Sequence, residues 1–245
     1  MIAVSGLAKK IGRQEILRGI DLTVAKGETL VIIGRSGGGK SVLLKHLIGL
    51  ITPDAGEIRI DGENIIGLSE RKLAEIRLKV GILFQGGALF DSMTVEENIA
   101  FPLREAGERD PKIIRERVSE MLEVMEMEGQ EKKMPVNLSG GMKKRVGLAR
   151  SIIRRPTCIL YDEPTSGLDP VVSDSINRLI RRLQERFRVT SIVVTHDMKS
   201  AVHVADHIAY LHQGRIYFYG TSQELEAARD PLIQDFLLGR SETSN

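Results

Sequence analysis

One octapeptide constrains the fold of this chain more than any other feature. It follows the pattern G-x-x-x-x-G-K-[ST] and consists of Gly34, Arg35, Ser36, Gly37, Gly38, Gly39, Lys40 and Ser41. The apolar run at 28–33 predicts a strand before it, and the apolar spacing at 41–50 predicts a helix after it. A glycine-rich turn at this place lets successive backbone N–H groups surround a phosphate, at a helix end whose dipole favours anions. We therefore expect a nucleotide's phosphates here, with Lys40 on the β- and γ-phosphates and the Ser41 hydroxyl on Mg²⁺.

Strands and helices alternate along most of the chain. Short apolar runs predict further strands at 57–61, 80–84, 157–161 and 189–195, and an amphipathic pattern predicts a helix over 172–187. This alternation predicts an α/β fold with a mostly parallel sheet. Two helical patterns within 111–155 interrupt it, so we expect a helical insertion bounded by Pro102 and Pro156. A short helix is expected from about 231, before the polar end SETSN at 241–245.

Composition excludes several classes of protein. Of the 245 residues, 42% are hydrophobic and 28% are charged, which suits a globular protein with a sizeable core. The net charge of +2 gives no general attraction to nucleic acid, and one cysteine, Cys158, excludes an intramolecular disulfide framework. No apolar run approaches the roughly 20 residues of a membrane-spanning helix, and the first residues lack the apolar stretch of a signal peptide. We expect a cytosolic chain without nucleic-acid partners.

Polar residues follow three of the predicted strands. Asp162 and Glu163 end the run at 158–163, Gln85 follows 81–84, and His196 follows 189–195. In a nucleotide hydrolase of this class the first acid helps to hold Mg²⁺, and the second is then free to act as a general base. Gln85 suits Mg²⁺ ligation or orientation of water, and His196 suits contact with a γ-phosphate. Taken singly, an acidic pair at a strand end is more often a solvated terminus, a glutamine more often a surface residue and a histidine more often structural. The octapeptide reverses this preference for the acidic pair.

A second glycine-rich helix start lies at 138–142. Ser139 is a good N-cap, and Gly140 and Gly141 permit close approach of another group. The segment is either an ordinary capped helix or a second anion-binding helix terminus.

These motifs together resemble the ATP-binding subunits of ABC transporters. The octapeptide at 34–41, Gln85, LSGGM (138–142), ILYDE (159–163), SGLD (166–169) and TH (195–196) occur in the order typical of that family, and the resemblance covers residues 2–222. It implies one domain over 1–245, with a nucleotide-binding core over about 1–85 and 156–222 that includes N-terminal antiparallel strands. A helical subdomain would span about 86–155, and a C-terminal helix and tail about 223–245.

The resemblance also implies a catalytic arrangement. Two copies would form a head-to-tail homodimer around two ATP molecules, each bound by the octapeptide of one copy and by Ser139, Gly140 and Gly141 of the other. Mg²⁺ would be held by Ser41, Gln85 and Asp162. Glu163 would polarise the attacking water, Lys40 and the other copy's Ser139 would stabilise charge on the γ-phosphate, and His196 would sense that phosphate.

A narrower resemblance lies directly after Gln85. The stretch FQGGALFDSMTVEENIAFPLRE (84–105), with SVLLKHLIGL (41–50) and DPLIQDFLLG (230–239), is similar to the ATPases of Mla/Mce phospholipid transporters. It implies phospholipid transport between membranes in support of outer-membrane lipid asymmetry, at the cytoplasmic face of the inner membrane. The implied partners are an Mla-type permease, an MCE-domain lipid-binding protein and a small STAS-domain regulator. Ala88, Leu89 and Phe90 would then be docking contacts for the permease, unless they belong to the core.

Two positions depart from the family pattern. Met142 replaces the usual glutamine of the signature, a change we expect to be tolerated because the serine and glycines make the phosphate contacts. Ile11 occupies the place where relatives commonly have an aromatic residue that stacks on adenine, so we expect weaker contact with the base.

Three alternatives remain within or near the family. A cytosolic ABC ATPase of iron–sulfur cluster assembly has a similar size, but the 84–105 stretch argues against it. The ATPase of another ABC importer is a second alternative. A DNA-repair ABC protein would need long coiled coils, for which the sequence has no pattern.

Overall fold

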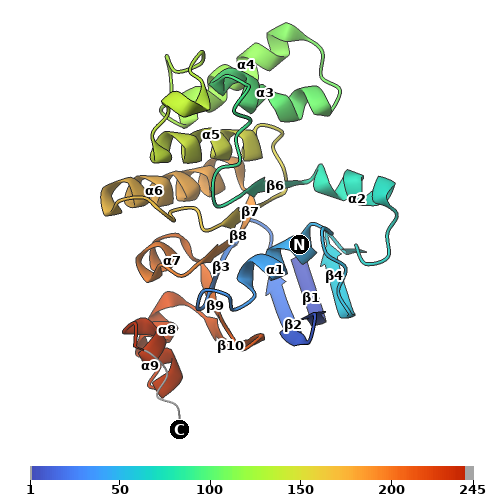
Figure 1. Cartoon of the computed structure of the whole chain (residues 1–245), viewed down its shortest axis with the longest axis vertical. Helices are drawn as coiled ribbons and strands as arrows, with labels where there is room; N and C mark the ends of the chain where they lie inside the picture. The colour runs from blue at the N-terminus through green and yellow to red at the C-terminus, as the bar shows by residue number, and fades with distance from the viewer. Residues whose placement is uncertain (1, 241–245) are drawn as a thin grey trace. The chain divides into compact units, whose positions relative to one another are not determined.

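The computed structural model describes residues 2–240, so the predicted tail at 241–245 lies outside the described residues. The chain divides into two compact units (Figure 1). The first unit combines residues 1–68 with 192–245, and the second consists of residues 69–191.

The first unit contains the expected antiparallel strands near the N-terminus. They form a four-stranded sheet in the order β2-β1-β4-β5, with β1 (Ile2–Ile11), β2 (Gln14–Val24), β4 (Ala55–Ile60) and β5 (Glu63–Asn64). Alternate side chains point to opposite faces of a strand, and the inward ones on β1 and β2 are aliphatic. They are Ile2, Val4, Leu7, Leu17, Ile20, Leu22 and Val24, all buried.

A second sheet in this unit carries the octapeptide. Strand β3 (Thr29–Ile33) is buried along its whole length and pairs in parallel with β9 (His207–His212), while β10 (Arg215–Gly220) is antiparallel to β9. Strand β8 (Thr190–Thr195) is the other neighbour of β3. The helices of the unit are α1 (Lys40–Leu47), α7 (Met198–Val204), α8 (Ser222–Ala227) and α9 (Pro231–Leu237).

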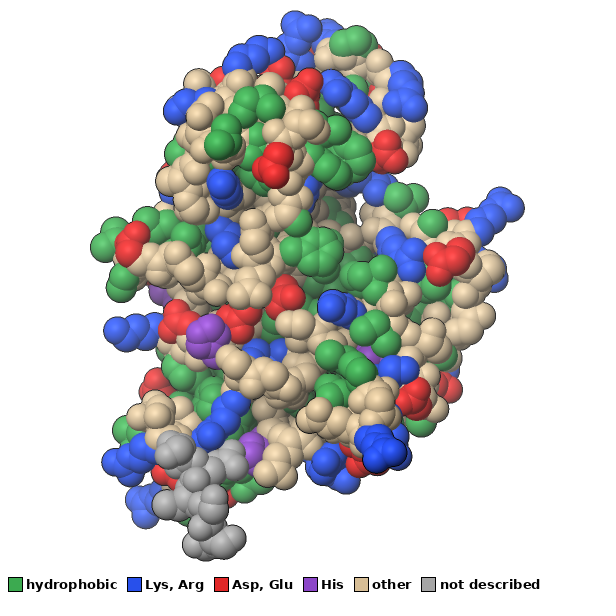
Figure 2. All heavy atoms as spheres, in the orientation of Figure 1, with side chains coloured by type: hydrophobic (Ala, Val, Ile, Leu, Met, Phe, Trp, Pro, Cys, Tyr) green, Lys and Arg blue, Asp and Glu red, His purple; other side chains and the backbone are tan. Residues whose placement is uncertain are grey.

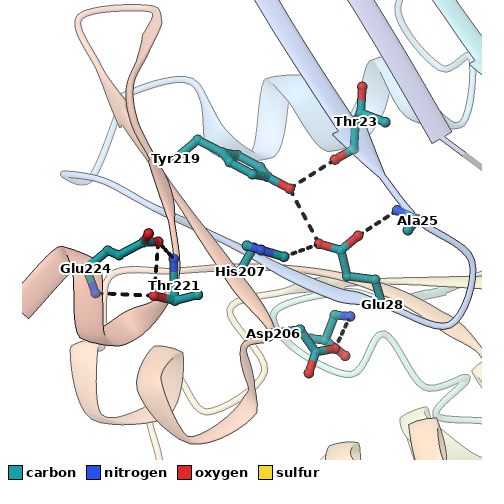
Figure 3. A network of polar contacts seen from close by, with 9 residues as sticks. Thr23, Ala25, Glu28, Asp206, His207, Tyr219, Thr221 and Glu224 are labelled. Carbon is teal, nitrogen blue, oxygen red and sulfur yellow. Dashed lines mark hydrogen bonds and ion pairs between the residues drawn. The ribbon is translucent and has the colours of Figure 1, made fainter.

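A polar network joins the start of β3 to β9 and β10 (Figure 3). The Glu28 carboxylate accepts from the backbone N–H of Ala25 at 2.6 Å, lies 2.7 Å from His207 Nδ1, and accepts from the Tyr219 hydroxyl at 3.4 Å. The rings of His207 and Tyr219 stack with centroids 5.4 Å apart. Burial, together with the nearby Glu28 carboxylate, raises the pKa of Tyr219. The network therefore fixes the turn that precedes β3.

The second unit pairs two parallel strands and is otherwise helical. Strand β6 (Val80–Leu83) pairs with β7 (Cys158–Asp162), with Val80 opposite Cys158 and Leu83 opposite Tyr161. The helices are α2 (Glu70–Arg77), α3 (Val95–Glu105), α4 (Pro111–Val124), the 3₁₀ turn η1 (Pro135–Asn137), α5 (Gly140–Ile152) and α6 (Pro170–Phe187). Helix α3 packs against α4 and α5. The predicted strands and helices are therefore present, with boundaries shifted by a few residues.

One expected boundary is wrong. Pro102 lies inside α3 instead of at the edge of the helical insertion. The helix begins at a capping box, in which the Thr94 side chain accepts from Glu97 N and the Glu97 side chain accepts from Thr94 N. Buried Ile99 and Leu103 hold the helix on both sides of the proline. Their burial offsets the one backbone hydrogen bond that a proline removes.

The mixture of charges on the surface and the character of the helices agree with what the composition predicts. On the face shown in Figure 2, Lys and Arg side chains are mixed with Asp and Glu. Within residues 2–240, no helix has both the length and the apolar character needed to cross a bilayer.

Candidate functional site

The octapeptide forms a tight loop between β3 and α1 in the first unit. A Cβ atom on Gly34 would lie 2.5 Å from the backbone oxygen of Leu211, so only glycine fits at the point where the chain leaves β3. The backbone N–H of Gly38 donates to the oxygen of Arg35 at 3.0 Å, and Gly39 is the N-cap of α1. The loop thus ends at a helix N-terminus whose first turn carries no acidic side chain. This arrangement suits a phosphate.

The Lys40 side chain curls back over its own loop. It is only 6% exposed, and its Nζ donates to the oxygens of Gly34 at 2.7 Å and Arg35 at 3.1 Å. A buried ammonium beside backbone N–H groups makes the loop a positively charged cradle. The next residue, Ser41, is half-buried in the first turn of α1 and carries a hydroxyl, a hard oxygen donor of the kind Mg²⁺ prefers.

A small cavity adjoins the loop. Its volume is about 190 Å³, and it is lined by Gln14, Glu15, Ile16, Arg18, Gly37, Gly38, Gln213 and Gly214. Ile11 does not line it but lies at the end of β1 with 51% of its surface exposed. At the other side of the loop, the Arg35 side chain donates to the oxygen of Arg240 at 2.8 Å.

His196 follows β8 directly and is exposed. The next residue, Asp197, is the N-cap of α7 and accepts from Lys199 N at 3.0 Å and from the Ser200 hydroxyl at 2.6 Å. The cap fixes the backbone at the point where the histidine leaves the strand.

In the second unit, two carboxylates lie at the end of β7. Cys158 and the following apolar residues of β7 are buried, Asp162 is half-buried, and Glu163 is 9% exposed. Glu163 has a φ of 49°, in the left-handed region that side chains other than glycine rarely adopt. Such backbone strain is concentrated at functional sites.

A closed ring of hydrogen bonds surrounds Glu163. Lys144 of α5 donates from Nζ to the backbone oxygen of Gln85 and, at 3.1 Å, to that of Glu163. The Gln85 side-chain amide donates to the Ser166 hydroxyl at 3.2 Å, and the backbone N–H of Ser166 donates to the oxygen of Glu163 at 3.2 Å. Burial lowers the pKa of Lys144, an effect that the Glu163 and Asp162 carboxylates partly oppose. The structure thus brings together Gln85 and Glu163, two of the predicted site residues.

The second glycine-rich segment begins α5 as expected. The Ser139 side chain caps the helix by accepting from Met142 N at 3.3 Å. A Cβ atom on Gly141 would lie 2.6 Å from Val172 of α6, and one on Gly140 would lie 3.2 Å from Leu168. Packing within the chain therefore disfavours a side chain at Gly141, whereas one at Gly140 would need Leu168 to shift by only a few tenths of an ångström.

The loop after Gln85 is exposed and firmly held. Ala88 and Phe90 are exposed and Leu89 is half-buried, so these residues are not core. Asn98 of α3, fully buried, accepts from the backbone N–H of Phe90 at 2.8 Å and donates to the oxygens of Phe90, Met93 and Thr94 at 3.0–3.1 Å.

A groove runs beside this loop. Its volume is about 360 Å³. Apolar side chains and three arginines line it, among them Ile82, Phe84, Ala88, Phe90, Phe101, Arg77, Arg150 and Arg154. The Arg150 guanidinium lies 5.5 Å from the centre of the Phe90 ring and donates to the oxygen of Gly87 at 2.9 Å. Burial lowers the pKa of Arg150 and Arg154, and among residues 2–240 neither pairs with a carboxylate.

Sequence reasoning assigned no role to Lys144, Asn98 or Ser166, although Ser166 begins the motif SGLD. Lys144 follows the glycine-rich signature within a basic run, where a solvated lysine is the usual outcome. Asn98 had a usable signal, because it is the polar member of an otherwise apolar helical face at 95–103.

Comparison with known proteins identifies the family. The ABC transporter family profile matches residues 17–166. The chain is 44% identical over 239 residues to the "Probable ribonucleotide transport ATP-binding protein mkl" of Mycobacterium tuberculosis, covering 98% of this chain and 67% of that protein. It is 40% identical over 242 residues to the "Intermembrane phospholipid transport system ATP-binding protein MlaF" of Haemophilus influenzae, covering 99% of this chain and 92% of that protein.

Solved structures agree with the sequence relatives. The dimeric post-hydrolysis state of the ATP-binding cassette MJ0796, bound to ADP and Pi, has a TM-score of 0.83 and 33% identity, with 90% of this chain and 98% of that chain covered. This chain belongs to the ABC transporter family and is an ATP-binding, ATP-hydrolysing subunit of that family.

Proposed function

We propose that this chain is the ATPase of a transporter that moves phospholipids between membranes. The observation that carries the proposal is the exposed groove beside residues 84–90, in the stretch whose sequence is similar to the Mla/Mce ATPases. The 40% identity to MlaF over nearly the whole chain supports it.

The catalytic roles follow the residue types present. ATP is the substrate, and its phosphates bind the loop at 34–41, where Lys40 supplies positive charge. Glu163 takes a proton from the attacking water as general base. His196 contacts the γ-phosphate. Ser41, Gln85 and Asp162 offer hydroxyl, amide and carboxylate oxygens, a donor set that suits Mg²⁺. When bound, Mg²⁺ neutralises charge on the phosphates.

The working unit of the proposal is a homodimer. MJ0796 is dimeric in its ADP- and Pi-bound form, which supports a dimer for this chain. Ser139, Gly140 and Gly141 of one copy would contact the nucleotide of the other copy through the start of α5.

The groove in the second unit is the proposed docking site for an Mla-type permease. Its apolar floor suits an apolar helical segment, and Arg150 and Arg154 lack carboxylate partners within residues 2–240. A permease segment with an acidic side chain would compensate those buried charges. The proposal includes a position at the cytoplasmic face of the inner membrane, with an MCE-domain protein and a STAS-domain regulator as further partners of the complex.

The relatives are named for different cargoes, phospholipid for MlaF and ribonucleotide for mkl. The full chain should therefore be purified with its membrane partner from detergent-solubilised membranes and reconstituted in phospholipid vesicles. We expect ATP-dependent transfer of a fluorescent phospholipid between vesicles. Transport of labelled ribonucleotide with no lipid transfer would replace the phospholipid assignment with the cargo named for mkl.

A groove variant tests the docking site in the same preparation. Phe90→Glu places a carboxylate against Arg150 and should lower recovery of the membrane partner at least about tenfold, the effect of losing one interface anchor. Val136→Glu is the matched control, because Val136 is 81% exposed in η1 and outside the groove. Equal recovery with both variants would contradict docking at this groove.

A further inference from the structure

Lys144 is unusual among the lysines of the second unit because its charge is buried. It is 4% exposed, although it lies in the basic run Lys143-Lys144-Arg145 near the start of α5. Burying an ammonium is costly unless its N–H groups are satisfied. Lys144 donates to two backbone oxygens, those of Gln85 and Glu163.

Both acceptor oxygens belong to residues that lie beyond the end of a strand, outside its regular hydrogen bonding. Gln85 lies two residues after the end of β6, and Glu163 lies directly after β7 in a left-handed conformation. Buried carbonyl groups at such positions need a donor from elsewhere in the fold. The Lys144 ammonium donates to both of these carbonyl groups. Because the Gln85 side chain also bonds Ser166, which in turn bonds Glu163, the two loops are joined on both sides of a ring.

The same helix holds the groove loop at a second point. Arg150, two turns beyond Lys144 on α5, donates to the oxygen of Gly87 and lies over Phe90. Gly147 faces this loop at close range, since a Cβ atom there would lie 3.3 Å from the oxygen of Gly87 and 2.7 Å from Leu83. Helix α5 therefore contacts the groove loop through several residues, but it reaches the Glu163 backbone through Lys144.

We propose that Lys144 is a positioning residue that ties the groove loop at 84–90 to the backbone of Glu163, so that the two loops move together. The ring transmits a displacement of the groove loop to the carboxylate that the proposed function names as the general base, and the inference rests on that function for its catalytic consequence. A small displacement of such a group costs a large part of the rate, about 100-fold for 1 Å.

The test compares four variants of the full chain: Lys144→Met, Lys144→Arg, Lys143→Met and Glu163→Gln. Methionine keeps the length of the side chain without its donors, and arginine restores donors and charge. Lys143 is the matched control, since it is the neighbouring lysine on α5 and makes no ring contact. Hydrogen exchange follows two amides that report on the loops, Gly87 N–H bonded to Phe84 and Ser166 N–H bonded to Glu163.

We expect Lys144→Met to lose protection at both amides, while the amides of β6 and β7 stay protected. Its kcat for ATP should fall about 10- to 100-fold, with KM within about threefold because ATP binds through the loop at 34–41. Lys144→Arg should regain part of both the protection and the kcat, and Lys143→Met should behave as the unmodified chain.

Loss of protection at only one loop, or at neither, would overturn the inference. So would a fall in kcat for Lys144→Met no larger than that for Lys143→Met. Should Lys144→Met not fold, Lys144→Leu, which also lacks donors, carries the same test, and an unchanged exchange pattern in it would count against the ring. If Glu163→Gln hydrolyses ATP at the normal rate, the assigned base is wrong, while the exchange result still decides whether Lys144 joins the loops.

Discussion

Two buried lysines, one in each unit, both bond their ammonium groups to backbone oxygens, but these oxygens lie at different separations along the chain. Lys40 and Lys144 are 6% and 4% exposed, and each donates to two backbone oxygens. The acceptors of Lys40, Gly34 and Arg35, lie six and five residues away in its own loop. Those of Lys144 lie 59 and 19 residues away, on two different loops.

The difference separates two kinds of functional geometry. A lysine that bonds its own loop needs only the local sequence, and its charge is available to the phosphate that we propose for the same loop. A lysine that bonds two distant loops depends on the packing of α5 against both, and its charge holds backbone in place. Substitutions in the two regions should therefore reduce ATP hydrolysis, ATP affinity or stability to different extents.

The largest loss of ATP hydrolysis is expected from Glu163→Gln. It removes the carboxylate but keeps the backbone oxygen that accepts from Lys144 and Ser166. ATP hydrolysis should slow about 10²–10⁴-fold, the usual contribution of a positioned general base, while ATP binding and exchange at Ser166 N–H stay unchanged. Single-turnover hydrolysis and a direct ATP-binding assay measure the two effects. Near-normal turnover would remove Glu163 from the base role and leave the ring without a catalytic purpose.

Lys40→Ala should cause a smaller loss of a different kind. It removes a charge that acts on bound ATP before as well as during the reaction, so affinity and turnover should both fall. Hydrogen bonds to charged groups contribute about 1.5–3 kcal/mol, which corresponds to about a 10- to 100-fold weaker ATP affinity. Titration calorimetry measures it, with Lys45→Ala as the control because Lys45 is exposed on the same helix. Normal affinity in Lys40→Ala would show that the loop binds phosphates without this charge.

The smallest effect is expected where α5 makes an exposed ion pair beside the buried Lys144. The Glu126 carboxylate accepts from Arg145 at 2.9 Å and from Arg182 at 3.0 Å, and these bonds lower the pKa of Glu126. The stability from this pair is therefore present above the ordinary glutamate pKa and is lost as pH falls through the lowered one. Glu126→Gln should cost at most about 1 kcal/mol at pH 7, because the carboxylate is largely exposed.

Thermal melts of Glu126→Gln and the unmodified chain over pH 7 to 4 test this sign. The gap between the two melting temperatures, about 2–4 °C per kcal/mol for a chain of this size, should narrow as pH falls. Glu123→Gln is the control, since Glu123 is exposed on α4. A gap that widens on acidification would mean that the exposed pair stabilises the fold by something other than the charge of Glu126.

The sequence predicted the elements, and the strand–loop–helix around the octapeptide, well because their causes are local. Apolar spacing predicted β3, β7 and α6 within a few residues, and the glycines and Lys40 lie in one run of eight. Ser139 was expected as an N-cap and is one. Pro102 was misplaced for the opposite reason, since buried neighbours on α3, and not the proline itself, decide where that helix continues.

The sequence by itself thus determined the strand–loop–helix that carries the octapeptide and the placement of acidic, amide and imidazole residues at strand ends. Only the tertiary structure decided that Gln85 and Glu163 share one ring, that Lys144 rather than Lys143 is buried, and that Ala88 and Phe90 line an exposed groove. The physical reason is the range of the contacts. Periodicity and loop chemistry act between near neighbours in the chain, whereas the burial of a charge depends on which carbonyl groups, tens of residues away, the packed helices bring to it.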